Sequence, residues 1–133
     1  MKILLDTHVL LWALQDSPEL SEQARYLINE PDNEIYYSLA SLWETQIKHV
    51  SHPKEMPLNS EKLEKYCVDS GFLFMPIRRE HIDYLDKLRV PDGLKHKNPF
   101  DRIMICQAVD EGMLFLTRDK RIAQYKEPCI YTV

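Results

Sequence analysis

The sequence contains few of the residues that mark disulfide-rich, zinc-binding or redox-active proteins. Its three cysteines, Cys67, Cys106 and Cys129, lie far apart and form no Cys-x-x-Cys pair. The five histidines show no His-x-x-x-His spacing. An odd number of widely spaced cysteines favours buried thiols in a reducing compartment over a disulfide framework or a zinc site.

Long apolar runs and targeting signals are also missing. No apolar stretch approaches the roughly 20 residues that a membrane span needs. The short segment before Asp6 has a single lysine and is not a secretory signal peptide. We therefore expect a cytoplasmic protein without a membrane anchor. Its 133 residues are enough for a single domain, residues 1–133, with a buried core.

Glycine-rich phosphate loops are absent, because neither a G-x-G-x-x-G nor a Walker pattern occurs. The chain also lacks the positive charge typical of nucleic-acid-binding proteins, since its net charge is −4. If four of the acids bind a metal ion, however, the rest of the chain is close to neutral. The charge balance therefore excludes neither a nucleic-acid partner nor a metal site.

Residues 98–119 have the clearest secondary-structure pattern. Asn98 is a good helix N-cap, and Pro99 suits the first helical position, where its missing N–H is no loss. Apolar residues then recur at helical spacing up to Gly112, which is placed to end the helix in a left-handed turn. The apolar run 113–117 follows and predicts a short buried strand.

The lengths of this helix and strand bring two aspartates together. About eleven helical residues climb roughly 16 Å, and about five strand residues return roughly the same distance. Asp101 in the first helical turn and Asp119 just after the strand should therefore lie at one edge of the sheet. Each also has an ordinary explanation, because Asp101 complements the helix dipole and Asp119 can start a turn or cap the next helix.

Asp6 stands at the end of another predicted strand, residues 2–5. A charged residue after a buried strand is expected at the carboxyl edge of an open α/β sheet, where such sheets have their sites. The alternative is that Asp6 only starts the helix that follows, which Thr7 could also cap.

Glu44 lies near the beginning of a helix expected over residues 39–50, after a β-prone segment at 35–38. If this helix began at Ser41 instead, Ser41 and Glu44 would form a capping box, and Glu44 would be structural. The neighbouring Trp43 is expected to pack in the core.

Strands alternate with helices along the chain, which predicts a parallel sheet covered on both faces. Right-handed crossovers place the carboxyl ends of the strands at one edge, so acids from four distant segments should face one cleft. The fold class is therefore α/β, with a Rossmann-like parallel sheet of four to five strands flanked by helices on both faces. The remaining helices are expected at residues 21–29, 60–70, 80–88 (with Ile82, Leu85 and Leu88 facing inward) and 120–125, and the remaining strands at 72–76 and 129–132.

Four clustered carboxylates predict a cation site. Side by side they repel one another and raise one another's pKa unless a cation lies among them. Oxygen ligands without histidine or cysteine suit Mg²⁺ or Mn²⁺. Magnesium held by a few carboxylates usually acts on phosphate, by activating water and neutralising developing charge. Hydrolysis of a phosphodiester bond is the reaction that fits best.

Four short motifs together resemble PIN domains, and in particular the VapC-like ribonuclease toxins of bacterial toxin–antitoxin pairs. The motifs are Asp6-Thr7 after a strand, Ser41-Leu42-Trp43-Glu44, Asn98-Pro99-Phe100-Asp101-Arg102 and Leu116-Thr117-Arg118-Asp119. The resemblance covers nearly the whole chain. One departure is Asn98, where relatives commonly carry Asp, which leaves one fewer charge for a second metal ion.

The resemblance implies a PIN-like fold and a Mg²⁺- or Mn²⁺-dependent endoribonuclease that is the toxin of such a pair. It also implies an RNA substrate, a cognate antitoxin and a homodimer. The resemblance implies an acidic catalytic site of Asp6, Glu44, Asp101 and Asp119, with Thr117 as a supporting hydroxyl. Of these acids we expect Asp6, Asp101 and Asp119 to be the metal ligands. We also expect Thr7 and Arg102 to support the site.

An RNA substrate would need positive surface, which the loops can supply. Arg102 adjoins Asp101 and is the strongest single candidate, although a salt bridge on the helix surface explains it nearly as well. Each loop cation also has an ordinary explanation as solvated surface charge. The loop candidates for RNA binding are Lys95, Lys97 and Arg118, within a wider set that includes His49, His52, Lys54, His96, Lys120 and Arg121.

Two other functions are compatible with the pattern. A phosphatase or phosphotransferase of the haloacid-dehalogenase or receiver type is also α/β with an aspartate at a strand end, but it needs a further acid that the Asp6-Thr7-His8 segment does not supply. A non-catalytic PIN-like binding domain would use the acidic cleft to hold a basic partner. The presence of acids at all four positions favours catalysis.

Overall fold

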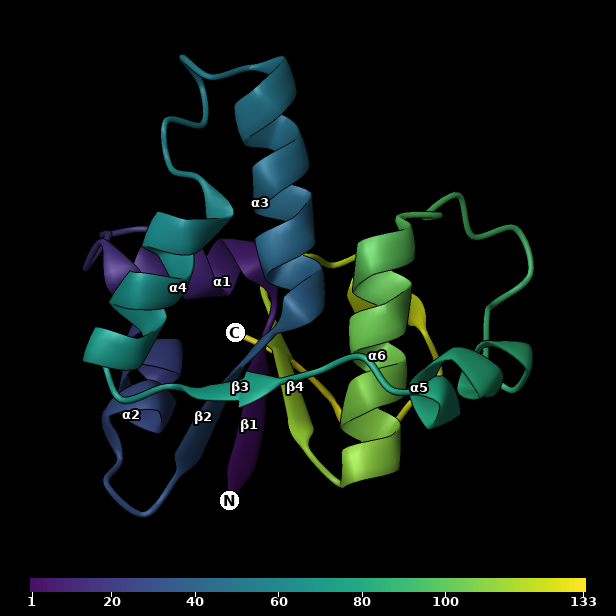
Figure 1. The fold of residues 1–133 in the computed structure, drawn as a ribbon. Helices are drawn as coiled ribbons and strands as arrows, with labels where there is room; N and C mark the ends of the chain where they lie inside the picture. Colours follow the sequence, from purple (N-terminus) through teal and green to yellow (C-terminus); the bar gives the residue numbers. More distant parts are fainter.

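The computed structural model describes residues 1–133 and contains one sheet of five parallel strands in the order β3-β2-β1-β4-β5 (Figure 1). The α/β fold class and the parallel sheet predicted from the sequence are confirmed. Every predicted strand is present within one residue of its expected bounds. The strands are β1 (Lys2–Leu5), β2 (Glu34–Ser38), β3 (Leu73–Met75), β4 (Leu114–Thr117) and β5 (Ile130–Thr132).

The strand order reverses between β1 and β4. From β1 the chain builds β2 and β3 outward on one side, and it later places β4 and β5 on the other. Leu5 pairs with Leu116, and a 3.0 Å hydrogen bond from the Asp6 N–H to the Leu116 carbonyl extends this pairing past the strand end. Open α/β sheets bind ligands at such a reversal, outside the carboxyl ends of the strands.

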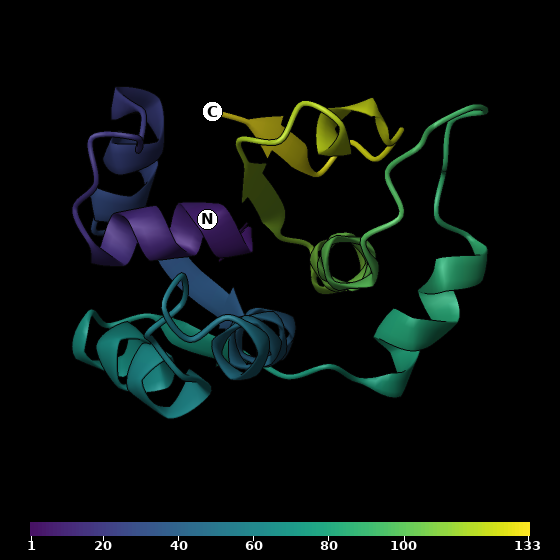
Figure 2. The ribbon, with the colours of Figure 1, turned by 90° about the horizontal axis from the view of Figure 1, so that it is seen from above.

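Helices cover both faces of the sheet, because the side chains of each strand alternate between them. In β1, Ile3 and Leu5 pack into one apolar cluster and Leu4 into the other. Figure 2 shows α1, α2 and α4 on one side of the sheet and α5 with α6 on the other. The helices are α1 (Thr7–Leu14), α2 (Glu22–Asn29), α3 (Leu39–Ser51), α4 (Ser60–Asp69), α5 (Arg79–Asp83) and α6 (Pro99–Glu111), with 3-10 turns η1 (Tyr84–Asp86) and η2 (Ile122–Gln124).

Helix α3 corrects two expectations. It begins at Leu39 with Ser38 as its N-cap, since the Ser38 hydroxyl accepts the Ala40 N–H at 2.9 Å. Ser41 therefore lies inside the helix, and the capping box with Glu44 is wrong. The expectation of a core Trp43 is also wrong, because this residue is 57% exposed. Its ring meets Phe100 edge-on at 5.1 Å instead of entering the sheet core.

The segment expected as one helix over 80–88 is shorter and irregular. A five-residue α5 passes into the 3-10 turn η1, which changes the helical phase. Ile82 and Leu85 are consequently 52% and 42% exposed, so the expectation that they face inward is wrong, whereas Leu88 is buried. The side chain of α5 that faces inward is that of His81, which is fully buried.

The segment expected as a helix over 120–125 contains only the 3-10 turn η2. None of the helices is long and apolar enough to cross a membrane.

Candidate active site

Thr117 joins the carboxyl ends of β1 and β4. Its hydroxyl donates to Asp6 Oδ2 at 2.6 Å and accepts the Asp119 N–H at 3.1 Å. Asp6 stands at the N-cap position of α1, but its side chain makes no capping hydrogen bond there. Asp6 is 4% exposed, and its carboxylate is held by the Thr117 hydroxyl of the neighbouring strand.

The N-terminus of α6 brings Asp101 to the same edge. Asn98 caps the helix, since its Oδ1 accepts the Phe100 N–H at 2.8 Å and the Asp101 N–H at 3.2 Å. The Asn98 amide also donates to Glu44 Oε2 at 3.3 Å, which connects α6 to α3. Gly112 ends α6 with a φ of +66°, as the sequence predicts, and the chain returns through β4.

Thr7 connects α1 to the helix that carries Glu44. Its hydroxyl lies 2.8 Å from the Ser41 hydroxyl, and both residues are buried. Because Ser41 precedes Glu44 by one helical turn, this contact fixes the first turns of α3 beside the end of β1.

The four acids lie close enough to act on one another electrostatically. Burial first, and then the negative charges of the other three acids, raise the pKa of Asp101 to about 8. Burial also raises the pKa of Asp6, against the lowering effect of the Thr117 hydrogen bond, and the charge of Glu44 adds to the rise. The structure therefore brings together the acids that the sequence predicted at this edge.

Asp119 differs from the other acids because it has a cation of its own. Burial raises its pKa, but the hydrogen bonds and charge of Arg121 outweigh burial and leave the pKa below its ordinary value. Arg121 binds both carboxylate oxygens, with its Nη2 atom 2.9 Å from Oδ2. Arg121 thus favours the charged form of Asp119, whereas burial disfavours the charged forms of Asp6 and Asp101.

His96 belongs to the site and was not predicted there. Its Nε2 atom lies 2.9 Å from Asp101 Oδ2. The expectation that His96 contacts phosphate is wrong, because the residue is 3% exposed and its ring faces Asp101. Atoms of His96, Asp101 and Asp119 that could bind a metal ion lie within 4.8 Å of one another.

Arg102 packs against the site, and the alternative explanation of Arg102 by a salt bridge on the helix surface is wrong. Its Nε atom donates to the Tyr125 hydroxyl at 2.8 Å, and its Nη2 atom donates to the His96 carbonyl at 2.9 Å. The guanidinium also lies 5.8 Å from the centre of the Tyr125 ring. Arg102 thus supports the loop that carries His96.

A hollow of about 210 Å³ includes two of the acids in its lining, which consists of Asp6, His8, Trp12, Arg118 and Asp119. The Arg118 guanidinium lies 6.0 Å from the centre of the Trp12 ring and donates to the Glu19 carbonyl at 2.8 Å.

Of the predicted RNA-binding residues, Arg118 adjoins the acids, because it lines the same hollow as Asp6 and Asp119. Lys95 and Lys97 are exposed on the loop that precedes α6.

Comparison with protein families agrees with this arrangement. The model of the PIN domain family matches residues 3–128, nearly the whole chain. The chain belongs to the PIN domain family. A search of curated proteins gave no significant match.

Solved structures share the fold of this PIN domain over its full length. VapBC2 from Rickettsia felis, bound to a DNA fragment from its promoter, aligns with a TM-score of 0.71 and 22% identity, covering 100% of this chain and 98% of that one. A toxin–antitoxin complex from Klebsiella pneumoniae aligns with a TM-score of 0.62 and 19% identity, covering 98% and 99%. VapBC-1 from nontypeable Haemophilus influenzae aligns with a TM-score of 0.62 and 15% identity, covering 99% and 98%.

The donor set of this PIN domain fits a hard divalent cation. The acids offer carboxylate oxygens, and Oδ1 of Asp101 makes no hydrogen bond within the protein. Burial first, and repulsion by the other acids second, raise the pKa of Asp101, and a cation bound beside it would favour its charged form. Oxygen ligands of this kind are those of Mg²⁺ and Mn²⁺.

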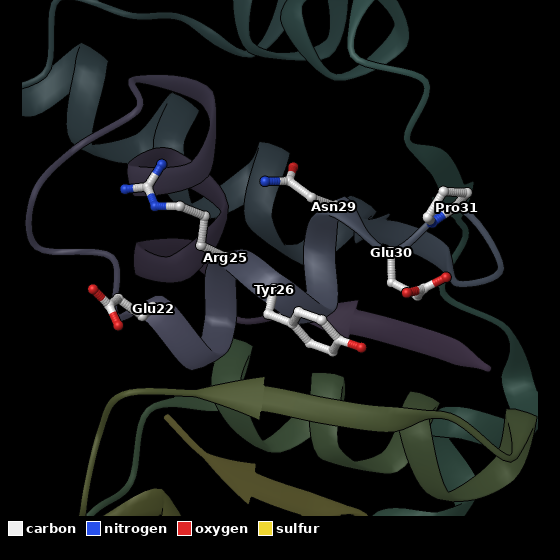
Figure 3. A pocket seen from close by; sticks show the side chains of 6 residues that line it. All are labelled: Glu22, Arg25, Tyr26, Asn29, Glu30 and Pro31. Atoms are coloured by element: carbon white, nitrogen blue, oxygen red, sulfur yellow. The ribbon is translucent and has the colours of Figure 1, made fainter.

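A larger hollow, of about 380 Å³, lies elsewhere and lacks this chemistry. It is lined by side chains of α2 and the turn after it, which Figure 3 shows spread along one helix. Glu22 lies at one end of the row in that view, and Glu30 lies beside Pro31 at the other end. None of its residues belongs to a group that could hold a metal ion.

Proposed function

We propose that this PIN domain is a metal-dependent endoribonuclease and the toxin of a toxin–antitoxin pair. The observation that carries the proposal is the convergence of four acids from distant segments at one edge of the sheet, three of them buried. Burial first, and then the charges of the other acids, raise the pKa of Asp101 to about 8. Burying several neighbouring carboxylates lowers the stability of the folded state. Carboxyl groups with strongly shifted pKa values cluster at functional sites.

Asp6, Asp101 and Asp119 would hold Mg²⁺ or Mn²⁺, and Glu44 adds a fourth negative charge beside them. When bound, the cation lowers the pKa of water and neutralises charge that develops on a phosphate. Thr117 orients Asp6 through its 2.6 Å hydrogen bond, so this carboxylate needs little reorganisation to bind a cation.

RNA is the substrate that the surroundings favour. Arg118 adjoins the acids and could neutralise a phosphate, and the exposed Lys95 and Lys97 lie on the loop before α6. The Trp12 ring in the neighbouring hollow offers an apolar face for a base of a single strand. An acidic pocket that could hold a metal ion, with the Arg118 cation beside it, suits a phosphodiester better than a small neutral substrate.

The toxin role rests on family likeness and on the acidic cluster. Solved relatives of the same fold are toxin–antitoxin complexes, which supports a cognate antitoxin as partner. A basic side chain of an antitoxin could enter the acidic cluster in place of the cation. Exposed apolar residues on α3, including Trp43 and Val50, support a further protein contact such as a homodimer in the cytoplasm.

The test is to treat the purified chain with a chelator and incubate it with a panel of structured RNAs. We expect no cleavage in chelator and defined cleavage products after addition of Mg²⁺ or Mn²⁺. Full cleavage in excess chelator would refute the metal mechanism. Metal binding without cleavage of any RNA would favour a non-catalytic binding domain.

A further inference from the structure

The loop before α6 places a buried histidine against a candidate metal ligand. Within residues 89–98, only His96 is buried, while its neighbours Lys95 and Lys97 are exposed. A polar ring buried in an otherwise exposed loop requires hydrogen-bond partners. His96 has one for each ring nitrogen, with Asp101 Oδ2 2.9 Å from Nε2 and the Tyr125 hydroxyl 3.0 Å from Nδ1.

The hydrogen bonds around Tyr125 determine which nitrogen of His96 carries the proton. The Tyr125 hydroxyl accepts the Arg102 Nε–H at 2.8 Å, so its own proton is free to be donated. The acceptors within reach are His96 Nδ1 at 3.0 Å and the His96 carbonyl at 3.3 Å. Donation to the nearer Nδ1 leaves the proton of a neutral ring on Nε2, where it is donated to Asp101.

The ring of His96 is fixed from several sides. The Tyr125 ring packs edge-on against it, with centroids 5.6 Å apart and an interplanar angle of 88°. Arg102 holds the His96 backbone through its carbonyl at 2.9 Å. The donor on Nε2 is therefore preorganised, and Asp101 meets it in one orientation.

We propose that His96 is a positioning residue for the cation. It holds Oδ2 of Asp101, so that Oδ1, which has no partner within the protein, is presented to the metal ion. Tyr125 and Arg102 keep the His96 ring in the orientation that makes this possible. Partners of this kind around metal ligands typically change metal affinity by about 10–100-fold when removed. The inference rests on the metal site of the proposed function.

The experiment measures Mn²⁺ affinity by calorimetry on purified full-length variants. His96→Leu removes the donor and should weaken Mn²⁺ binding by about 10–100-fold. His96→Gln keeps an N–H near the position of Nε2 and should recover most of the affinity. Tyr125→Phe removes only the hydroxyl behind the ring and should give a smaller loss with the fold intact.

His81 supplies the matched control. It is also fully buried and its Nε2 lies 2.9 Å from a carboxylate, that of Glu111, but it is not part of the acidic site. His81→Leu should lower the melting temperature and leave Mn²⁺ affinity unchanged. This separates the loss of a buried histidine from the loss of the contact with Asp101.

The outcomes distinguish the positioning role of His96 from the metal site on which that role depends. Mn²⁺ binding by His96→Leu with wild-type affinity would refute the positioning role and leave the metal site intact. Equal losses in His96→Leu and His96→Gln would mean that the N–H to Asp101 is not what His96 supplies, and would also refute it. If His96→Leu does not fold, unchanged affinity in Tyr125→Phe refutes it. A wild-type chain that binds no Mn²⁺ would remove the metal site and this inference together.

Discussion

Two groups of side chains in this protein have the same composition, one histidine and two acids, yet differ in what surrounds them. The first is His96 with Asp101 and Asp119, and the second is His81 with Asp110 and Glu111. In each, a buried histidine Nε2 lies 2.9 Å from a carboxylate oxygen. By composition and spacing alone the two are equivalent.

The second group forms a hydrogen-bonded contact between α5 and α6. His81 Nδ1 accepts the Arg78 N–H at 2.9 Å, so the proton of the neutral ring lies on Nε2 and is donated to Glu111. The Asp110 and Glu111 side chains are 39% and 28% exposed, so water screens their charges. The contact joins a short helix to a long one, and the Arg78 Nε atom lies 3.9 Å from Glu111 Oε2.

The first group lies where the strand order reverses and where two further acids reach the same point. Asp101 is 7% exposed, and its pKa is raised first by this burial and then by the charges of Asp6, Glu44 and Asp119. The difference teaches that the proposed cation site is distinguished by several buried acids that raise one another's pKa at the carboxyl edge of the sheet. A histidine beside two carboxylates is insufficient by itself.

The largest effect that we expect separates the two groups by activity. Asp101→Asn should reduce RNA cleavage on the order of 10²–10³-fold or more, the scale of losing one preorganised electrostatic contact. Asp110→Asn should leave cleavage unchanged. In cells, expression of the wild-type chain by itself should slow growth, and Asp101→Asn should relieve this. Equal toxicity of wild type and Asp101→Asn would mean that the growth effect does not come from this site.

The next effect is on the pH dependence of stability in chelator. The pKa of Asp101 is about 8 in the fold and near 4 in the unfolded chain, so the folded state binds more protons between these values and loses stability as pH rises. From pH 6.5 to 8.5 the free energy of unfolding should fall on the order of 2 kcal/mol. Urea unfolding should show this fall in wild type and in Asp110→Asn. The slope should flatten in Asp101→Asn, and an unchanged slope would contradict the assignment.

The smallest effect is on the melting temperature of the metal-free protein. Burial raises the pKa of Asp6, so Asp6→Asn removes an unfavourable charge and leaves an oxygen that can accept the Thr117 hydrogen bond. Without metal the variant should melt at or a few degrees above wild type. It should also lose most of the stabilisation that Mn²⁺ gives to the wild-type chain, because a ligand stabilises only by binding the folded state. Metal-free melting well below wild type would make Asp6 a structural residue.

The position of the acids was predictable because it follows from regular structure. Asp6 and Asp119 come directly after buried strands, and Asp101 occupies the first turn of a helix with a clear cap and a clear end. Strand direction and helix length then fix their common edge. Glu44 required only that its helix begin at Leu39, which the Ser38 cap provides.

The environments of loop and surface residues were not predictable in the same way. His96 stands between two lysines in a loop, where no periodicity indicates burial, and its contact with Tyr125 spans 29 residues. Trp43 lies among apolar residues on α3, but α3 exposes that face. Which face of a helix meets the sheet depends on how the neighbouring elements pack, and a single sequence does not contain that information.

The most direct test of this account is to observe where Mn²⁺ binds. A paramagnetic ion broadens the amide NMR signals of nearby residues, so a substoichiometric titration of labelled wild-type protein reports the site. We predict that the signals of Thr7, Asp101 and Asp119 disappear first, while those of Arg78, His81 and Asp110 persist. Asp101→Asn should weaken this pattern, and Asp110→Asn should not. Broadening that begins around His81 and Asp110, or that spreads evenly over the protein, would contradict a cation site at the four acids.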